Sequence, residues 1–457
     1  MSQRTAAFFQ AIFDLSSSIV LFLASFLALL LHGLRQVLTR RIPVKLTINE
    51  KNSALVSEHS TTTIFEMIKE RCPSLYGPQA TFRPTWWLPG GDLQTIWCVV
   101  AEMFYRDSIP YTRQLLRLPD GGTISLDVYP PFEGPDDDTP ILFVLHGLTG
   151  TTQESYTRAT VKDITRSKVE TGTGFRVVAL NFRGCDVDSP VTTPRLYHAG
   201  ETDDTRSALL WLTQTYPKAP LYGCGFSMGA STLACYLGQE GDKTPLKGAI
   251  CVSNPWDWVT ATDHIENGGF LNRYIYGPIL ADALLTMFKN SRYAFEIDKR
   301  LNIKDIYSRR YVTIRWFDDR VTAPQFGFKD AMDYYDKASS SRYVHKIRVP
   351  HLSIQSADDP MVALKNLPTD DVAESDHVVM ATTAVGGHVA WFTTREDRWF
   401  TTPIREFIEA IHSVCGQSLS NFYWTLIVHA LVGSYTTTYA RCTADRCQRS
   451  RSVPQFA

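Results

Sequence analysis

The chain has 457 residues, of which 44% are hydrophobic and 12% aromatic, a composition that suits a globular protein with a large core. Its formal net charge is −1, from 46 Lys and Arg against 47 Asp and Glu. This balance argues against a nucleic-acid-binding protein, which normally carries a basic face or stripe. The nine cysteines are scattered, and no second close pair accompanies Cys442 and Cys447, which argues against a zinc site.

Near the N-terminus, Leu15 to Leu34 (LSSSIVLFLASFLALLLHGL) carries no acidic or strongly basic residue across 20 positions. At about 1.5 Å per residue, a helix of this length reaches roughly 30 Å, the thickness of the hydrocarbon core of a bilayer. No small-x-small cleavage site follows in LHGLRQVLTRR, which favours an uncleaved transmembrane anchor over a signal peptide. The sequence therefore predicts a tail at 1–14, an anchor at 15–34 and a polar linker or arm at 35–80.

The charges beside the predicted anchor indicate its orientation. Basic residues follow it at Arg35, Arg40, Arg41 and Lys45, whereas Arg4 is the only basic side chain before it. By the positive-inside rule, the C-terminal side lies in the cytoplasm. The scattered cysteines and the absence of an N-glycosylation sequon agree with a cytosolic main domain. We expect a single-pass membrane protein, for which the endoplasmic reticulum and lipid droplets are both compatible locations.

From about residue 110 the chain alternates between strand and helix patterns. QLLRLPDGGTISLDVYP has the pattern of a hairpin. Apolar runs typical of buried parallel strands follow in PILFVLHG, FRVVALNFRG, APLYGCGFS, LKGAICVSNP, RVPHLSIQSADDP and DHVVMATTAVGGH. Helical patterns lie near residues 154–167, 203–215, 228–239 and 403–412. This alternation predicts an α/β fold with a mostly parallel central sheet flanked by helices, and with its chemistry at the carboxyl ends of the strands.

One such strand end carries a candidate nucleophile. Gly225-Phe226-Ser227-Met228-Gly229 has the form G-x-S-x-G, in which a serine occupies a strained turn between a strand and a helix. The flanking glycines leave room for the crowded backbone, and Phe226 is the residue expected to be strained. A serine hydroxyl is a weak nucleophile near neutral pH, so Ser227 requires a base within hydrogen-bond reach and a group that orients the base.

The base and the acid are expected at later strand ends. Among eleven histidines, His388 stands out because it follows an apolar strand in GGHVAWF, in the last third of the chain, where the serine–acid–histidine order places the base. Between Ser227 and His388, SADDPMV supplies Asp358 and Asp359 at another strand end. We favour Asp359 as the acid, and we expect Asp358 to cap or brace the loop.

Two backbone N–H groups are predicted to stabilise the oxyanion of such a reaction. Met228 opens the helix after the nucleophile, and Leu148 follows the third strand in LHGLTG. His146 and Gly147 shape the turn that precedes Leu148. Two preorganised donors of this kind each contribute a factor of roughly 10²–10³ in rate.

With these residues identified, the chain resembles the AB hydrolase superfamily, family 4, a group of membrane-anchored hydrolases and fungal ethyl ester synthase/esterase and monoacylglycerol lipase enzymes. The resemblance covers about residues 80–412 and rests on WWLPGGDLQTIW, HGLTGTTQESY, NFRGCDVDSP, GCGFSMGA, NPWDW, FDDRVTAPQFGF, SADDPMV and VGGHVAWF. The family pattern places the triad on Ser227, Asp359 and His388. Asp359 is preferred to Asp358 because the acid of this fold commonly precedes the residue before an apolar pair. One departure is Asp92, where relatives often have His, Arg or Asn.

The resemblance implies an α/β-hydrolase domain at 81–414, with a cap insertion at about 256–341 between strands six and seven, and a tail at 415–457 that includes a short apolar segment at 422–433. FLNRYIYGPILADALLTMF, within the insertion, offers an apolar surface for acyl chains or packs on the core. The resemblance also implies lipid ester substrates, a membrane anchor, and neither cofactor nor metal.

Several functions remain open at this stage. The first is a membrane-bound serine hydrolase that cleaves short- to medium-chain carboxylic esters and acylglycerols. The second is an alcohol O-acyltransferase, which forms the same acyl-enzyme but transfers the acyl group to an alcohol. A phospholipase and a catalytically inactive binding protein are weaker alternatives, the latter because the triad and its glycines are intact.

Overall fold

A computed structural model describes residues 40–415, apart from residues 52–53, 58–59, 105–106, 135, 187 and 190. The predicted anchor at 15–34 and the C-terminal segment at 422–433 lie outside these residues. Within the described part of the chain, no helix is both long and apolar enough to cross a membrane.

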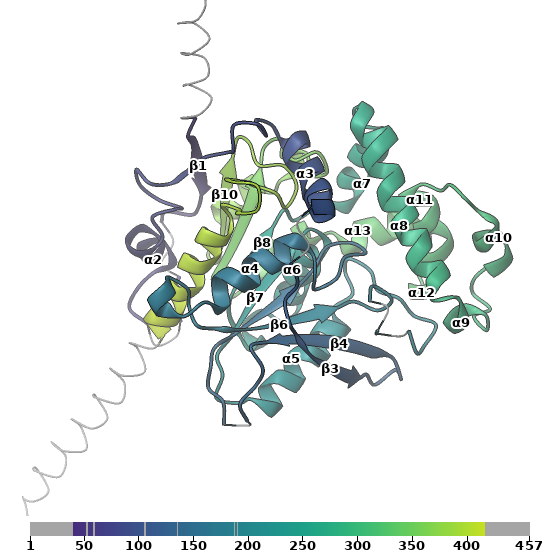
Figure 1. The fold of residues 1–457 in the computed structure, drawn as a ribbon, viewed down its shortest axis with the longest axis horizontal. Helices are drawn as coiled ribbons and strands as arrows, with labels where there is room; N and C mark the ends of the chain where they lie inside the picture. Colours follow the sequence, from purple (N-terminus) through teal and green to yellow (C-terminus); the bar gives the residue numbers. More distant parts are fainter. Residues whose placement is uncertain are drawn as a thin grey trace, which may run out of the picture.

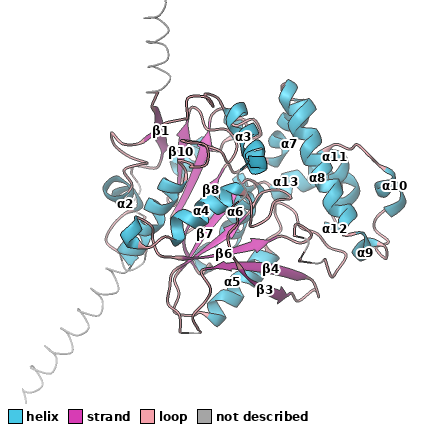
Figure 2. Cartoon of the chain, viewed as in Figure 1, coloured by secondary structure: helices cyan, strands magenta, loops and turns pink. Residues whose placement is uncertain are grey.

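The centre of the molecule is a sheet of ten strands in the order β2-β1-β10-β9-β8-β7-β5-β6-β4-β3 (Figures 1 and 2). The run from β10 to β6 is parallel, and the antiparallel pairs lie at its two ends. The strands are β1 (Ile42–Thr47), β2 (Thr81–Phe82), β3 (Thr112–Arg117), β4 (Thr123–Tyr129), β5 (Ile141–Leu145), β6 (Arg176–Asn181), β7 (Leu221–Phe226), β8 (Leu246–Val252), β9 (His351–Ser356) and β10 (Val378–Thr383). The predicted α/β fold with its hairpin and mostly parallel sheet is confirmed.

Alternate residues of the central strands point to the two faces of the sheet, as strand geometry requires. In β5, Phe143 and Leu145 pack into a core with helices α5 (Asp203–Thr215) and α6 (Met228–Glu240). Leu142 and Val144 pack into the opposite core, with α2 (Ile64–Arg71), α4 (Ser155–Thr165) and the helix over residues 401–415. The sheet therefore has helices on both faces.

The prediction of a linker at 35–80 is wrong from residue 42 onward. Strand β1 pairs antiparallel with β10, with Val44 opposite Thr383, and adds an edge to the sheet. Helix α2 begins with a capping box in which Thr63 and Glu66 satisfy each other's backbone N–H groups. The sequence signal was the alternation of Ile42, Val44 and Leu46 with more polar residues, which has the period of a strand.

A helical insertion separates β8 from β9, where the cap was predicted (Figure 1). Its helices are α7 (Trp258–Asn267), α8 (Gly277–Asn290), α9 (Arg292–Phe295), α10 (Ile303–Ser308), α11 (Ile314–Phe317), α12 (Ala323–Phe326) and α13 (Ala331–Ala338). The apolar stretch named above packs on the core through the inner face of α8, with Leu284, Leu285 and Phe288 buried, while Phe270, Tyr274 and Ile279 are exposed. The predicted packing of this stretch on the core is therefore found, and its use as a surface for acyl chains stays a prediction.

Candidate active site

Ser227 lies in a strained turn between β7 and α6. Its backbone has φ 52° and ψ −120°, a left-handed conformation that non-glycine residues rarely adopt. A Cβ atom on Gly225 would come within 2.5 Å of the Gly229 carbonyl oxygen, and one on Gly229 would collide with the carbonyl oxygens of Leu145 and His146. Only glycine fits at either position. The prediction that Phe226 is the strained residue is wrong. Phe226 ends strand β7, and the residue with positive φ is Ser227 itself.

The three side chains predicted as a triad are in contact. Nε2 of His388 lies 2.7 Å from Oγ of Ser227, and Nδ1 of His388 lies 2.8 Å from one carboxylate oxygen of Asp359 and 3.1 Å from the other. A carboxylate only accepts hydrogen bonds, so Nδ1 carries the proton and Nε2 is left to accept the serine hydroxyl. This arrangement prepares His388 to remove the proton of Ser227.

Asp359 is held by its own loop. Its side chain is buried, and Oδ1 accepts the backbone N–H groups of Met361 at 2.8 Å and Val362 at 3.0 Å. Oδ2 makes the shorter of the two contacts to His388. The two N–H groups fix the carboxylate, which in turn fixes the imidazole ring.

Asp358, the other candidate acid, does not contact His388 in the described structure and instead joins three segments. Its Oδ1 accepts the N–H groups of Gly386 at 2.9 Å and Gly387 at 3.1 Å and the hydroxyl of Ser356 at 2.7 Å, and its Oδ2 accepts the N–H of Gly91 at 2.6 Å. Asp358 therefore braces the loop that carries the histidine, in keeping with the role expected for it.

The loop after β5, which carries Leu148 as one of the two predicted oxyanion donors, lies against the nucleophile. In the described part of the chain, neither the N–H of Leu148 nor that of Met228 has a hydrogen-bond acceptor. Gly147 lies directly against the serine, because a Cβ atom added to it would stand 3.3 Å from Cβ of Ser227. Two backbone donors close to one nucleophile are what an oxyanion hole requires.

His146 holds this loop in place. Its Nδ1 donates to the Gly147 carbonyl oxygen at 2.7 Å, so Nε2 is the acceptor for the N–H of Phe182 at 3.2 Å. Burial lowers the pKa of His146 to about 4, so the ring is neutral at physiological pH. The loop is also tied by the hydroxyl of Tyr156, which accepts the N–H of Gly147 at 2.9 Å.

Helix α3 (Gly91–Phe104) supports the site, although the sequence patterns assigned it no role there. Thr95 Oγ1 accepts the backbone N–H of His388 at 2.9 Å, and Gln94 Oε1 accepts that of Phe392 at 2.6 Å. Ser253, at the end of β8, accepts the N–H of Val389 at 3.0 Å. The available signal was the resemblance block WWLPGGDLQTIW, which contains the start of α3.

Two cavities adjoin this region. One of about 30 Å³ has Leu148 and Met228 in its wall and is otherwise formed mainly by apolar residues of the insertion, among them Trp258, Leu284, Met287, Ile314, Phe317 and Val321. The other, of about 1020 Å³, runs from Thr149 along α8. Met287 lines both cavities. The oxyanion loop thus adjoins an apolar space that belongs to the insertion.

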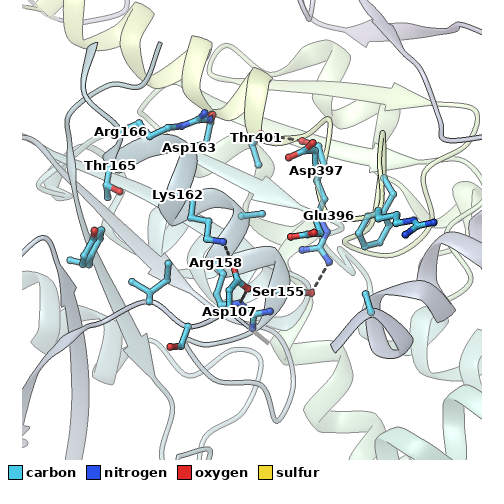
Figure 3. Close-up of a pocket in the computed structure, with 18 of the residues that line it drawn as sticks. Asp107, Ser155, Arg158, Lys162, Asp163, Thr165, Arg166, Glu396, Asp397 and Thr401 are labelled. Carbon is cyan, nitrogen blue, oxygen red and sulfur yellow. Dashed lines mark hydrogen bonds and ion pairs between the residues drawn. The ribbon is translucent and has the colours of Figure 1, made fainter. Parts of the chain in front are cut away.

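A third cavity, of about 680 Å³, is lined by many charged residues (Figure 3), and, like the other two, it has none of Ser227, Asp359 and His388 in its lining. Its charges are largely paired with one another: Arg158 Nε donates to Asp107 at 3.0 Å, and Lys162 pairs with the same carboxylate. Such a lining does not suit an acyl chain, because it offers no continuous apolar surface.

Comparison with known proteins agrees with the α/β fold of this chain. Residues 140–382 match the family model described as alpha/beta hydrolase fold. The monoacylglycerol lipase of Saccharomyces cerevisiae is 32% identical over 397 residues, which cover 78% of this chain and 86% of the relative. Medium-chain fatty acid ethyl ester synthase/esterase 2 of the same yeast is 36% identical, covering 59% and 62% of the two chains, and phospholipase ABHD3 of Bos taurus is 28% identical, covering 75% and 81%.

The chain belongs to the α/β hydrolase family. Within that family it is an ester hydrolase, and its similarity to lipases and esterases supports a lipid ester as the substrate.

Proposed function

We propose that the chain is a serine hydrolase of the family 4 type that cleaves carboxylic esters, with monoacylglycerol-type lipids of short to medium chain as substrates. Ser227 is the nucleophile, His388 the base, and Asp359 the group that orients the base. The observation that carries this proposal is the continuous line of contacts from Asp359 to His388 to Ser227, at 2.8 and 2.7 Å, which ends on a residue in a strained left-handed turn.

In the proposed mechanism, Oγ of Ser227 attacks the ester carbonyl carbon while its proton passes to Nε2 of His388. The negative charge that develops on the carbonyl oxygen is stabilised by the N–H groups of Leu148 and Met228. The C–O bond to the alcohol then breaks, and His388 returns the proton to the leaving oxygen, which leaves an acyl-serine. Water, deprotonated by His388, attacks the carbonyl carbon of this intermediate; the bond from that carbon to Oγ of Ser227 then breaks, His388 returns the proton to Oγ, and the carboxylic acid is released.

The acyl chain is assigned to the apolar cavity beside Leu148 and Met228. This cavity lies next to the position of the reacting carbonyl, and most of its wall comes from the insertion. At about 30 Å³ it is smaller than a medium-length acyl group, so side chains have to move to admit one. Met287 is suited to this movement, because methionine is unbranched and adapts to irregular spaces. The groove along α8, which Met287 also lines, then supplies the route from solvent.

The proposal includes attachment to a membrane through residues 15–34, with the hydrolase domain on the cytosolic side. Its supports are the length and apolarity of that segment and the basic residues that follow it. Carbonate extraction of membranes should leave the protein in the pellet, and a C-terminal tag should be digested by protease in sealed microsomes. Release by carbonate would contradict the anchor, and a shielded tag would contradict the orientation.

Transfer of the acyl group to an alcohol is a second candidate activity, supported by the similarity to an enzyme named an ethyl ester synthase/esterase. It differs from hydrolysis only in the nucleophile that attacks the acyl-serine. Incubation with a thioester or ester donor in the presence of ethanol would separate the two activities by the ratio of ethyl ester to free acid.

The central test is labelling with a fluorophosphonate probe, followed by an ester panel. Ser227→Ala should lose both labelling and hydrolysis while the fold remains intact. Ser231→Ala is the matched control, because Ser231 lies one turn further along α6 and its hydroxyl accepts the indole N–H of Trp258. Retained labelling in a folded Ser227→Ala protein would rule out this nucleophile.

A further inference from the structure

Helix α3 has an apolar face with no cover in the described structure. Leu93 is 47% exposed, Val99 66% and Phe104 71%, and Ile96 and Val100 between them are partly exposed. Leu93, Ile96, Val100 and Phe104 are spaced three or four residues apart, so they form one stripe along the helix, and Val99, three residues after Ile96, extends this stripe along one side. A continuous apolar surface of this kind marks an interaction site on a folded protein.

Other groups along α3 are fixed to the catalytic loops. The N–H of Gly91 donates to Asp358, the hydroxyl of Thr95 accepts the N–H of His388, and the indole N–H of Trp97 donates to the carbonyl oxygen of Arg395 at 3.0 Å. These contacts set the direction in which the apolar stripe faces, and they couple its position to that of the catalytic histidine.

The chain enters the described structure beside this helix. Nη1 of Arg40 donates to the carbonyl oxygen of Pro89 at 3.3 Å, two residues before α3 begins. The five residues between the predicted anchor and Arg40 span at most about 18 Å, at up to about 3.6 Å per residue. The apolar stripe therefore starts close to the point at which the chain would leave the bilayer. Arg40 and Arg41 are both exposed, as suits side chains beside lipid phosphates.

The insertion continues the same surface. The hydroxyl of Tyr276 donates to Asp92 at 2.9 Å, which joins the start of α3 to the segment η3 (Asn272–Tyr276) ahead of α8. Phe270, 72% exposed, and Tyr274 stand next to it, with their rings 5.1 Å apart. In Figure 1, β1, α3 and the insertion helix α7 lie in the upper part of the molecule.

We propose that the exposed stripe of α3, together with Phe270 and Tyr274, lies in the lipid–water interface of the membrane to which the chain is attached. This inference rests on the proposed membrane attachment. Aromatic rings at a membrane surface favour this depth, and an interfacial helix buries one apolar face among the lipid headgroups and the upper acyl chains. The surface would hold His388 and the edge of the insertion at a set distance from the bilayer, so that a lipid ester reaches the site without crossing bulk water.

The direct test uses the full chain in phosphatidylcholine vesicles, with the photoreactive residue p-benzoylphenylalanine replacing Val99. A matched control carries it at Leu210 on α5, which is 55% exposed and lies outside the proposed surface. We expect lipid adducts at position 99 and few at position 210. Adducts to residues 15–34, adducts to a second copy, equal lipid labelling at both positions, or no lipid adduct would each overturn the proposal.

A kinetic test uses Val99→Glu, with Leu210→Glu as its control. The measurement is the ratio of monoacylglycerol hydrolysis in vesicles to hydrolysis of a soluble p-nitrophenyl ester by the same preparation. Loss of one buried valine side chain predicts a fall of about tenfold in this ratio for Val99→Glu, and no change for Leu210→Glu. An unchanged ratio for Val99→Glu would contradict the docking surface. Fluorophosphonate labelling of Ser227, measured in parallel, reports separately on the proposed serine mechanism.

Discussion

The carboxyl edge of the sheet and the helical insertion build their parts of the site in different ways. At the edge, backbone groups fix the chemistry: Ser227 stands in a left-handed turn, and Asp359 is held by two N–H groups of its own loop. In the insertion, side chains such as Leu284 and Phe317 enclose a small cavity by packing alone. The proposed reaction chemistry is thus tied to geometry that tolerates few substitutions, whereas the surface proposed to bind the acyl chain can change residue by residue. Substitutions at the sheet edge and in the insertion are therefore expected to have different effects.

The largest effect is expected from the two neighbouring aspartates at the edge. Asp359→Asn should lower kcat by about 10⁴, because the amide can donate to Nδ1 and so favours the wrong tautomer of His388. Asp358→Asn should lower kcat by a factor of at most about 10², which is the loss expected when the loop that carries His388 is slightly displaced. Steady-state kinetics on one soluble ester compares the two directly. If Asp358→Asn proved the more damaging, the assignment of the acid would be wrong.

Gly90 and Gly91, at the start of α3, allow a second comparison, in which the expected loss of kcat is smaller. A Cβ atom on Gly91 would collide with the backbone oxygen of Asp358 and lie 2.6 Å from its Cγ, whereas one on Gly90 would meet nothing within 4 Å. Gly91→Ala should therefore displace the brace that holds the His388 loop and lower kcat by up to about 10². Gly90→Ala should behave like the parent protein. Equal activity of the two variants would show that the brace has no influence on His388.

The insertion should respond with a change of substrate and not of mechanism. Leu284 lines the apolar cavity, and Leu285, the next residue of α8, is buried but does not line it. Leu284→Ala should enlarge the cavity and move the preferred p-nitrophenyl ester to a longer acyl chain, since each buried methylene is worth about 0.8 kcal/mol. Leu285→Ala should cost about 2–5 kcal/mol of stability, as truncation of a buried leucine does, with the preference unchanged. The measurement is kcat/KM for p-nitrophenyl esters from C4 to C16. If Leu284→Ala and Leu285→Ala shifted the preferred chain length equally, the acyl chain would bind outside this cavity.

The same difference explains what the sequence could predict. Ser227, His388 and the pair at 358–359 were found because strand ends, glycines and chain order mark them in a one-dimensional pattern. The cap was located through the family resemblance, which places it between two strands, but its cavity depends on which faces of several short helices meet. Helix α3 escaped notice as part of the site because Thr95 and Gln94 act through contacts with residues about 290 positions later in the chain. Strand β1 was missed for a simpler reason: its alternation is short and includes Pro43.

The smallest expected effect is on how the free energy of unfolding depends on pH, and its sign differs between the sheet edge and the insertion. Burial lowers the pKa of His146, at the sheet edge, to about 4, while burial raises that of Asp318, in the wall of the insertion cavity, to about 7. Between pH 4 and 6.5 the unfolded chain binds more protons at His146 than the folded chain does, so this group makes the free energy of unfolding fall as pH falls. Asp318 acts in the opposite direction, because the folded chain holds its proton between about pH 4 and 7, and stability is lost as pH rises through that range.

His146→Gln should therefore flatten the loss of stability toward acid, and Asp318→Asn should flatten the loss toward neutral pH, each by about 1.4 kcal/mol per pH unit at most. Urea unfolding at pH 5, 6 and 7 measures both. If the two variants changed the slope in the same direction, at least one of the two pKa shifts would run opposite to the direction assigned to it.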